Sequence, residues 1–335
     1  MRILVTGAAG LIGGETCARL AARGHDVTAL VHRERGVRGN DRRPVDGVTI
    51  LPGDVTRPGL GLAAAPDFDL VIHSAAITAF DAPADLYDRV NVAGTAHVAA
   101  LGLPLLHVST AYVCGTRDGV VSEDSTGTEF VNGYEASKAA GEAIVRAAGV
   151  PFAIARPSVV VGASDSGEIS RFENIYMIFK LIAEGRVRTL PGAASASLDL
   201  VPIDHVCGGI VAMAENFAGV AGKTLHLVGA SPVPLTLIGE AIAAVPGLGA
   251  PHFVDPADFA PARLPPTERR YHAAAAALYT SYLLRGPVFD TANAAALVPP
   301  CPPTGRAWLD RLIGYCVEQG FVTSRRGRGS QAISA

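Results

Sequence analysis

The chain has 335 residues, enough for a doubly wound domain and a smaller lobe, and hydrophobic residues make up 49% of it. Its formal net charge of −3 gives no electrostatic reason to expect nucleic acid or an acidic membrane surface as a partner. The five cysteines are scattered without CxxC spacing, so they predict reduced thiols in a cytoplasmic protein and no metal site. No apolar run approaches the roughly 18 residues of a membrane span, and a strand that begins at residue 2 leaves no room for a signal peptide.

The first half of the chain alternates short apolar runs with longer helical stretches. Its predicted strands are nearly continuous in apolar residues, whereas the strands of an antiparallel sheet would alternate polar and apolar positions. This order is typical of a parallel sheet covered by helices on both faces, and we expect an α/β fold, a doubly wound parallel sheet of the Rossmann type. The predicted strands are 2–6, 26–31, 48–51, 69–73, 104–109 and 151–156, and the predicted helices are 11–23, 82–101 and 134–148.

The rhythm of the sequence changes after Arg156-Pro157, where Gly, Ser and Pro become frequent. We expect helices over about 171–184 and 268–284 and a strand over 224–228 in this half. Apolar residues within 171–183 and 278–284 can line a lipophilic pocket, although plain core is the favoured interpretation.

These patterns predict the domain organisation. A dinucleotide-binding Rossmann domain spans 1–160, and part of 200–230 returns to it. A smaller, mixed lobe over 161–323 mainly binds the substrate, since irregular second halves of this kind often do. The arginine-rich tail over 324–335 is expected to be disordered.

Three glycines mark the turn between the first strand and the first helix. Gly7, Gly10 and Gly13 follow a strand and open a helix, which is the setting that a dinucleotide-binding fingerprint requires. Gly7 permits the tight turn, Gly10 lets the backbone approach a pyrophosphate, and Gly13 allows close packing of the helix on the strand. Leu11 and Ile12 begin the helix, so their backbone is expected to face the phosphates of the dinucleotide.

The residues after the second strand predict which dinucleotide is bound. An Asp or Glu at that strand end serves the ribose hydroxyl of NAD, whereas an arginine serves the 2′-phosphate of NADP. No acid ends the strand here, and His32 and Arg33 follow Val31 directly. The sequence therefore favours NADP(H), with Arg33 at the 2′-phosphate, and Glu34 keeps a solvated charged turn open as the alternative.

Small and polar residues end further strands, where the ligand crevice of an open parallel sheet lies. The Asp54 carboxylate, after the third strand, can accept from the adenine amino group or cap the next turn. A hydroxyl of Ser109 or Thr110, at the end of the fifth, can bond a substrate oxygen, but for Ser109 a bond to the backbone is favoured. The expected cofactor contacts at strand ends are Asp54, Val55, Ser74, Ala75, Ala76 and Pro157.

Tyr134 and Lys138 are the most informative pair in the chain. They stand four apart in a predicted helix, so a phenol and an ammonium share one face. A nearby cation favours the phenolate, and such a tyrosine can exchange a proton with a carbonyl or alcohol oxygen. Only three lysines occur against 25 arginines, which makes a lysine at this position less of an accident of usage.

Taken together, these motifs resemble the extended short-chain dehydrogenase/reductases over roughly residues 1–215. The order of Gly7-x2-Gly10-x2-Gly13, Gly53-Asp54-Val55, His73-Ser-Ala-Ala, Asn91-Val-Ala-Gly-Thr, Ser109-Thr110, Tyr134-x3-Lys138 and Arg156-Pro157 carries the resemblance. Within that family the segment from His107 to Val113 looks most like the fatty acyl-CoA and carrier-protein thioester reductases.

The resemblance implies roles for three residues. Thr110 and Tyr134 would bind the substrate oxygen, with Tyr134 as the catalytic acid/base. Lys138 would bond the nicotinamide ribose and lower the pKa of Tyr134. The substrate would be a small-molecule carbonyl compound, and a thioester, an aldehyde and a ketone all remain open.

Two other functions compete with an NADPH-dependent reductase. A nucleotide-sugar epimerase or dehydratase has the same fold, but Ala111 and Tyr112 follow Thr110 where the dehydratases of the family carry an acidic pair. A non-catalytic NADP-binding sensor would have no reason to keep Tyr134 and Lys138 together. The helices at 82–101 and 134–148 can pair into a homodimer interface or pack within one chain.

Overall fold

The computed structural model describes residues 1–34, 36–64, 67–192 and 196–323. Within these ranges seven strands form one parallel sheet in the order β12-β7-β5-β4-β1-β2-β3. The predicted doubly wound α/β fold is confirmed, and the tail predicted to be disordered lies outside the described residues. The strands are β1 (Arg2–Thr6), β2 (Asp26–Val31), β3 (Val48–Pro52), β4 (Leu70–His73), β5 (Leu105–Val108), β7 (Phe152–Pro157) and β12 (Thr224–Leu227).

Successive side chains of each strand point to opposite faces of the sheet, and both faces are buried. In β1, Ile3 and Val5 belong to a core with Leu20 of α1 and Ile210 of α6, whereas Leu4 belongs to a second core with α3 and α4. This explains the continuous apolar runs of the sequence. The helices of this domain are α1 (Leu11–Ala22), α2 (Ala84–Tyr87), α3 (Ala93–Ala99), α4 (Gly133–Ala147), α6 (Ile203–Glu215) and α7 (Phe217–Val220).

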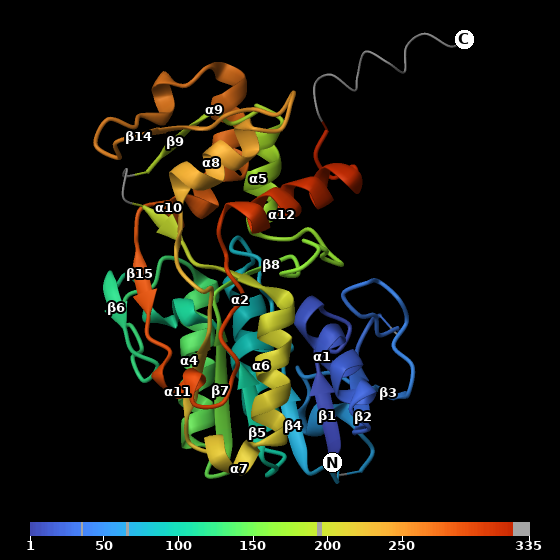
Figure 1. Cartoon of the computed structure of the whole chain (residues 1–335). Helices are drawn as coiled ribbons and strands as arrows, with labels where there is room; N and C mark the ends of the chain where they lie inside the picture. Colours follow the sequence, from blue (N-terminus) through green and yellow to red (C-terminus); the bar gives the residue numbers. More distant parts are fainter. Residues whose placement is uncertain (35, 65–66, 193–195, 324–335) are drawn as a thin grey trace.

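A second lobe lies above the carboxyl ends of the strands (Figure 1). It has its own apolar core, which includes Ile178, Leu190, Ile238 and Trp308. Its helices include α5 (Ile175–Ala183), α8 (Leu235–Ala243), α9 (Pro266–Ala274), α10 (Thr280–Leu283) and α12 (Arg306–Glu318), and α11 (Ala292–Ala295) lies back against β12.

Short two-stranded pairs connect the lobes and trim their edges. They are β6 (Gly119–Val121) with β15 (Pro287–Phe289), β8 (Val159–Val161) with β11 (Leu200–Pro202), β9 (Thr189–Pro191) with β14 (His252–Val254), and β10 (Ser197–Leu198) with β13 (Val233–Pro234).

Three predicted helices differ from the structure. The stretch predicted as one helix over 82–101 contains a π-helical turn between α2 and α3, where Asn91 bonds both backbone groups of Ile77. The helix predicted over 268–284 is interrupted, because Ala275 has φ −145° and a 3₁₀ turn follows it. The helix predicted from 171 begins only at Ile175, since Asn174 has φ +51°, outside the helical region.

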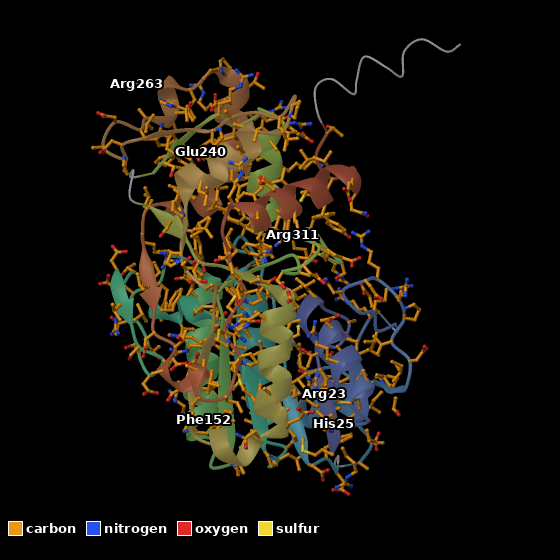
Figure 2. The ribbon with its side chains drawn as sticks, in the orientation of Figure 1. Arg23, His25, Phe152, Glu240, Arg263 and Arg311 are labelled. Carbon is orange, nitrogen blue, oxygen red and sulfur yellow. The ribbon has the colours of Figure 1, made fainter. Side chains whose placement is uncertain are left out.

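The ends of α1 and α6 are tied together on one face of the sheet. Arg23 and His25, which follow α1, lie beside each other in Figure 2. The Arg23 guanidinium is 3.4 Å from the Glu215 carboxylate at the end of α6, and His25 Nε2 is 3.1 Å from the same oxygen. This contact lies at the end of the sheet opposite the second lobe, so it stabilises the domain far from the ligand crevice.

Candidate active site

Two adjoining cavities lie at the carboxyl ends of the strands, where the strand order reverses between β1 and β4. The inner cavity, of about 390 Å³, is lined by Gly10, Leu11, Ile12, Gly13, Ser74, Ala76, Thr110, Tyr134 and Pro157, with residues of the second lobe. The outer cavity is lined by Gly7, Gly10, His32, Arg33, Asp54, Val55, Ser74, Ala75 and Ala76. The structure thus brings the residues expected at the cofactor together, with Lys138 as the exception.

The glycine loop has the shape that a dinucleotide needs. Gly7 has φ +68°, and a Cβ atom there would lie 2.6 Å from the backbone nitrogen of Ala75. A Cβ on Gly13 would lie 2.2 Å from the Gly7 carbonyl oxygen, so only glycine lets α1 pack this closely. Gly10 caps α1 and faces both cavities, and the first turn of α1 contains no acidic residue. The helix N-terminus is therefore open to an anion, and the residues present fit a dinucleotide.

The loop after β2 presents charge to the outer cavity. His32, Arg33 and Glu34 are exposed and line it. The Asp54 carboxylate accepts from the backbone nitrogen and the hydroxyl of Thr56 at 2.9 and 2.8 Å, which is the turn-capping alternative of the sequence analysis. Because Asp54 also lines the cavity, its second oxygen still faces the adenine side.

Tyr134 stands at the start of α4 and faces the inner cavity together with Thr110. Asn132 caps this helix by accepting from the Glu135 backbone nitrogen at 2.9 Å. Burial raises the pKa of Tyr134 to about 12, although a hydrogen bond with Thr110 opposes the shift. The expected lowering of this pKa is therefore wrong for this structure, in which burial outweighs the surrounding charges.

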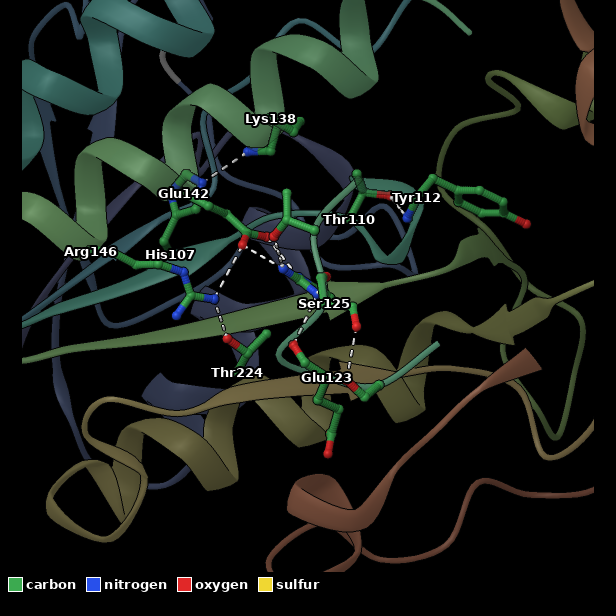
Figure 3. Close-up of polar contacts among 12 residues, drawn as sticks. His107, Thr110, Tyr112, Glu123, Ser125, Lys138, Glu142, Arg146 and Thr224 are labelled. Atoms are coloured by element: carbon green, nitrogen blue, oxygen red, sulfur yellow. Dashed lines mark hydrogen bonds and ion pairs between the residues drawn. The ribbon is translucent and has the colours of Figure 1, made fainter. Parts of the chain in front are cut away.

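Lys138 is buried one turn further along α4 and does not line either cavity. Its Nζ donates to the Val108 carbonyl oxygen at 2.7 Å and lies 3.4 Å from His107 Nε2 (Figure 3). Burial lowers the pKa of Lys138 to about 8, while the negative charge of Glu142 raises it. Burial and the charge of Lys138 also lower the pKa of His107 well below its usual value, so His107 is neutral and can accept from the ammonium.

A buried ion pair supports α4 from behind (Figure 3). Glu142, one turn beyond Lys138, receives two hydrogen bonds from the Arg156 guanidinium at 2.7 and 2.8 Å. Arg156 also donates to the carbonyl oxygens of Glu123 and Ser125. Burial would raise the pKa of Glu142, but the Arg156 hydrogen bonds and charge lower it below its usual value. The pair joins α4 to β7 directly behind the candidate catalytic residues.

The second lobe contributes side chains that sequence analysis missed. Phe80 packs against Tyr134 at 5.8 Å between ring centroids and stacks on Tyr282 of α10 at 5.1 Å. The Tyr282 hydroxyl donates to Glu135 at 2.7 Å, and Arg285 pairs with the same carboxylate. The second lobe thus holds the start of α4. The sequence carried no motif for these contacts, because they join residues about 150 positions apart.

Of the apolar stretches expected to line a pocket or form core, few residues reach the inner cavity. Ile175 and Tyr282 line it, whereas Ile178 and Leu283 belong to the core of the second lobe and Met177 is exposed. Arg171, Glu173 and Asn174, which precede α5, also line the cavity. Only two of its described lining residues, Arg171 and Glu173, carry charge.

Two further properties concern the described part of the chain. No group of three or more His, Cys, Asp and Glu side chains there could hold a metal ion. None of the helices in the described ranges is long and apolar enough to cross a membrane.

Comparison with known sequences decides the family. A sequence model of the family described as male sterility protein matches residues 5–210, well over half of the chain. The chain belongs to this family. The predicted resemblance to the extended short-chain dehydrogenase/reductases of the thioester-reductase-like branch is confirmed, and the chain is an oxidoreductase that binds a nicotinamide dinucleotide.

Relatives of this male sterility protein family member include known ketone reductases. It is 30% identical over 268 residues to the 2-alkyl-3-oxoalkanoate reductase of Stenotrophomonas maltophilia (strain K279a), covering 75% of this chain and 77% of that one. It is 28% identical over 249 residues to the 4-hydroxy-2-methyl-3-oxo-4-farnesyl-3,4-dihydroquinoline-1-oxide ketoreductase of Stigmatella aurantiaca, covering 70% of each.

A solved structure shares its fold across both lobes. The terminal R domain from the myxalamid PKS-NRPS biosynthetic pathway matches with a TM-score of 0.82 and 24% identity, over 96% of this chain and 92% of that one. The second lobe is therefore part of the shared fold.

Proposed function

We propose that this protein is an NADPH-dependent reductase that converts a small-molecule carbonyl compound to an alcohol, with Tyr134 as the proton donor. The observation that carries the proposal is that Tyr134 and Thr110 line the same cavity as Gly10, Leu11 and Ile12 of the glycine loop. A proton donor and a dinucleotide site thereby share one space. We also propose that the lobe over 161–323 binds most of the substrate.

The chemistry follows from the side chains around the carbonyl oxygen. A nicotinamide ring bound in the inner cavity supplies hydride to the carbonyl carbon. Tyr134 and Thr110 donate hydrogen bonds to the carbonyl oxygen, and donors placed at a developing oxyanion are typically worth about 3 kcal/mol each. Because its pKa is near 12, Tyr134 keeps its proton at neutral pH until an alkoxide, which is more basic than a phenolate, develops beside it.

Lys138 assists from within the helix. Its ammonium is fixed by the Val108 carbonyl oxygen and the neutral His107 ring, which leaves its position independent of the cavity contents. A positive charge four residues along α4 favours the phenolate that proton transfer leaves on Tyr134. We propose that Lys138 also contacts the ribose of the bound dinucleotide.

The charge of the inner cavity supports an uncharged, largely apolar substrate. Its charged lining residues are Arg171 and Glu173, whereas Phe80, Tyr112, Tyr176 and Tyr282 form an aromatic wall. The diphosphate of a sugar nucleotide would need several cations in this position. An apolar ketone is the first candidate, as in the two relatives named above, and an aldehyde or acyl thioester is the second.

The test combines a substrate panel with one substitution. NADPH and NADH oxidation is followed with a 2-alkyl-3-oxoalkanoate, a cyclic ketone, an aromatic aldehyde and a medium-chain acyl-CoA. Tyr134→Phe should lower kcat by roughly a hundredfold or more and leave NADPH binding nearly unchanged, because only the proton donor is lost. Tyr271→Phe, on α9 of the second lobe, serves as the matched control.

Three outcomes would contradict the proposal. Wild-type turnover by Tyr134→Phe would show that this residue is not the acid. Tight NADPH binding without turnover of any carbonyl compound would favour the sensor. Turnover of a sugar nucleotide alone would favour the epimerase or dehydratase.

A further inference from the structure

Arg171 reaches from the loop before α5 back to the cofactor side of the sheet. Its Nη2 donates to the Ala9 carbonyl oxygen in the glycine loop at 2.9 Å and to Glu34 Oε2 after β2 at 2.8 Å. Its Nη1 lies 3.9 Å from Glu173 Oε1. One side chain from the second half of the chain thus bridges the two loops that border the dinucleotide site.

The cavities place Arg171 at a junction. Arg171 and Gly10 line the inner cavity, the outer cavity and a third recess that adjoins them. This basic recess is lined by Ala9, Gly10, Glu34, Gly36, Arg38, Arg42, Ser170 and Arg171. Three arginines against one glutamate make it an attractive site for an anion.

The backbone before Arg171 is fixed to the first domain. The Asn40 amide donates to the Glu168 carbonyl oxygen at 2.8 Å and accepts from the Ser170 backbone nitrogen at 3.1 Å. The Arg42 guanidinium donates to the carbonyl oxygens of Ile169 and Ser170 at 3.2 and 3.1 Å. Because Arg171 follows this anchored segment, only its side chain has to turn when its partner changes.

The partner of Arg171 is easily replaced. The Arg171 and Glu34 side chains are 40% and 63% exposed, and ion pairs this exposed contribute little to stability. A phosphate dianion offers the planar guanidinium stronger, bidentate hydrogen bonds than a solvated carboxylate. In the pair as it stands, Glu34 occupies Arg171 and adds a negative charge beside the recess, so a phosphate must compete with it.

We propose that Arg171 binds the adenosine 2′-phosphate of NADP(H) by exchanging Glu34 for it, and so makes the second half of the chain part of cofactor selection. Glu34, at the position after β2 where the 2′-substituent of the ribose is read, holds the guanidinium ready and is released to solvent by the exchange. Arg33 and Arg171 then flank the phosphate from opposite sides of Glu34. This inference rests on the proposed NADPH cofactor.

The experiment measures binding rather than turnover. Isothermal titration calorimetry with NADPH and NADH compares the wild-type protein with Arg171→Gln, Glu34→Gln and, as control, Arg306→Gln. Arg306 pairs with Asp310 on α12, and its side chain is 41% exposed, which matches Arg171. Thermal unfolding of each variant checks that it folds.

Arg171→Gln should weaken NADPH binding by about 10- to 100-fold, as expected for a hydrogen bond to a charged group. Its NADH affinity should change by less than about twofold, because only a weak exposed ion pair is lost. Glu34→Gln should tighten NADPH binding severalfold by removing the competing carboxylate, and Arg306→Gln should change neither affinity.

Equal losses for both cofactors would place Arg171 at the pyrophosphate and overturn the 2′-phosphate assignment, as would an unchanged NADPH affinity. These results are distinct from a failure of the proposed cofactor, which would show as a wild-type protein that binds NADPH no more tightly than NADH.

Discussion

The buried pair of Glu142 and Arg156 allows a quantitative prediction. Both side chains are at most 2% exposed, and two hydrogen bonds join them. The substitution Glu142→Gln keeps the size of the side chain but leaves the Arg156 guanidinium buried without its counter-charge. It should therefore destabilise the protein, since removing one partner of a buried ion pair costs about 3–5 kcal/mol.

The expected shift in melting temperature follows from the size of the chain. In a domain of more than about 150 residues, each kcal/mol moves Tm by about 2 °C or slightly more. Glu142→Gln should therefore lower Tm by about 6–10 °C, measured by circular dichroism. Glu240→Gln, on the exposed side of α8 (Figure 2), removes the same charge from the surface and should leave Tm within about 1 °C of wild type.

A double-mutant cycle tests the cause of the loss. Arg156→Met alone strands the Glu142 carboxylate, whereas Glu142→Leu with Arg156→Met removes both charges and should be more stable than the sum of the single losses predicts. Strictly additive losses, or a Glu142→Gln variant that melts with the wild type, would refute the reasoning. The pKa of Lys138 should also fall further below 8 in Glu142→Gln, because Glu142 raises it.

Two further predictions concern the glycine loop and a buried acid. Gly13→Ala should abolish detectable dinucleotide binding and lower Tm, because its Cβ would lie 2.2 Å from the Gly7 carbonyl oxygen; normal titration calorimetry would contradict this. Burial raises the pKa of Asp199 from 3.8 to about 6, so its contribution to stability is complete below pH 4 and is lost as the pH rises through 6. Asp199→Asn should thus gain stability relative to wild type by up to about 3 kcal/mol between pH 4 and pH 7, and urea unfolding that shows the same difference at both pH values would refute it.

Local patterns were enough to predict the sheet and the residues at its carboxyl ends. The strand ends, the glycine loop and the helical spacing of Tyr134 and Lys138 each lie within a few residues of sequence, and the doubly wound fold brings them together by its connectivity. For this reason the residues expected at the cofactor line two adjoining cavities in the structure.

Tertiary packing decided the remainder. The π-helical turn at Asn91 depends on its bonds to Ile77, and these form only after the loop beyond β4 has folded against the helix. The direction of the Tyr134 pKa shift depends on how much of the phenol is buried, which no spacing of residues reports. The position of Lys138 likewise depends on the Val108 carbonyl oxygen of β5.

The sequence by itself determined the fold, the family and the face on which the chemistry takes place, because strand and helix periodicity and the glycine loop are local properties. Only the tertiary structure decided which side chains of the second lobe enter the site. Arg171 lies 137 residues from Glu34, and Tyr282 lies 147 residues from Glu135. Contacts over such separations arise from the packing of one lobe on the other, and no local pattern in the chain encodes them.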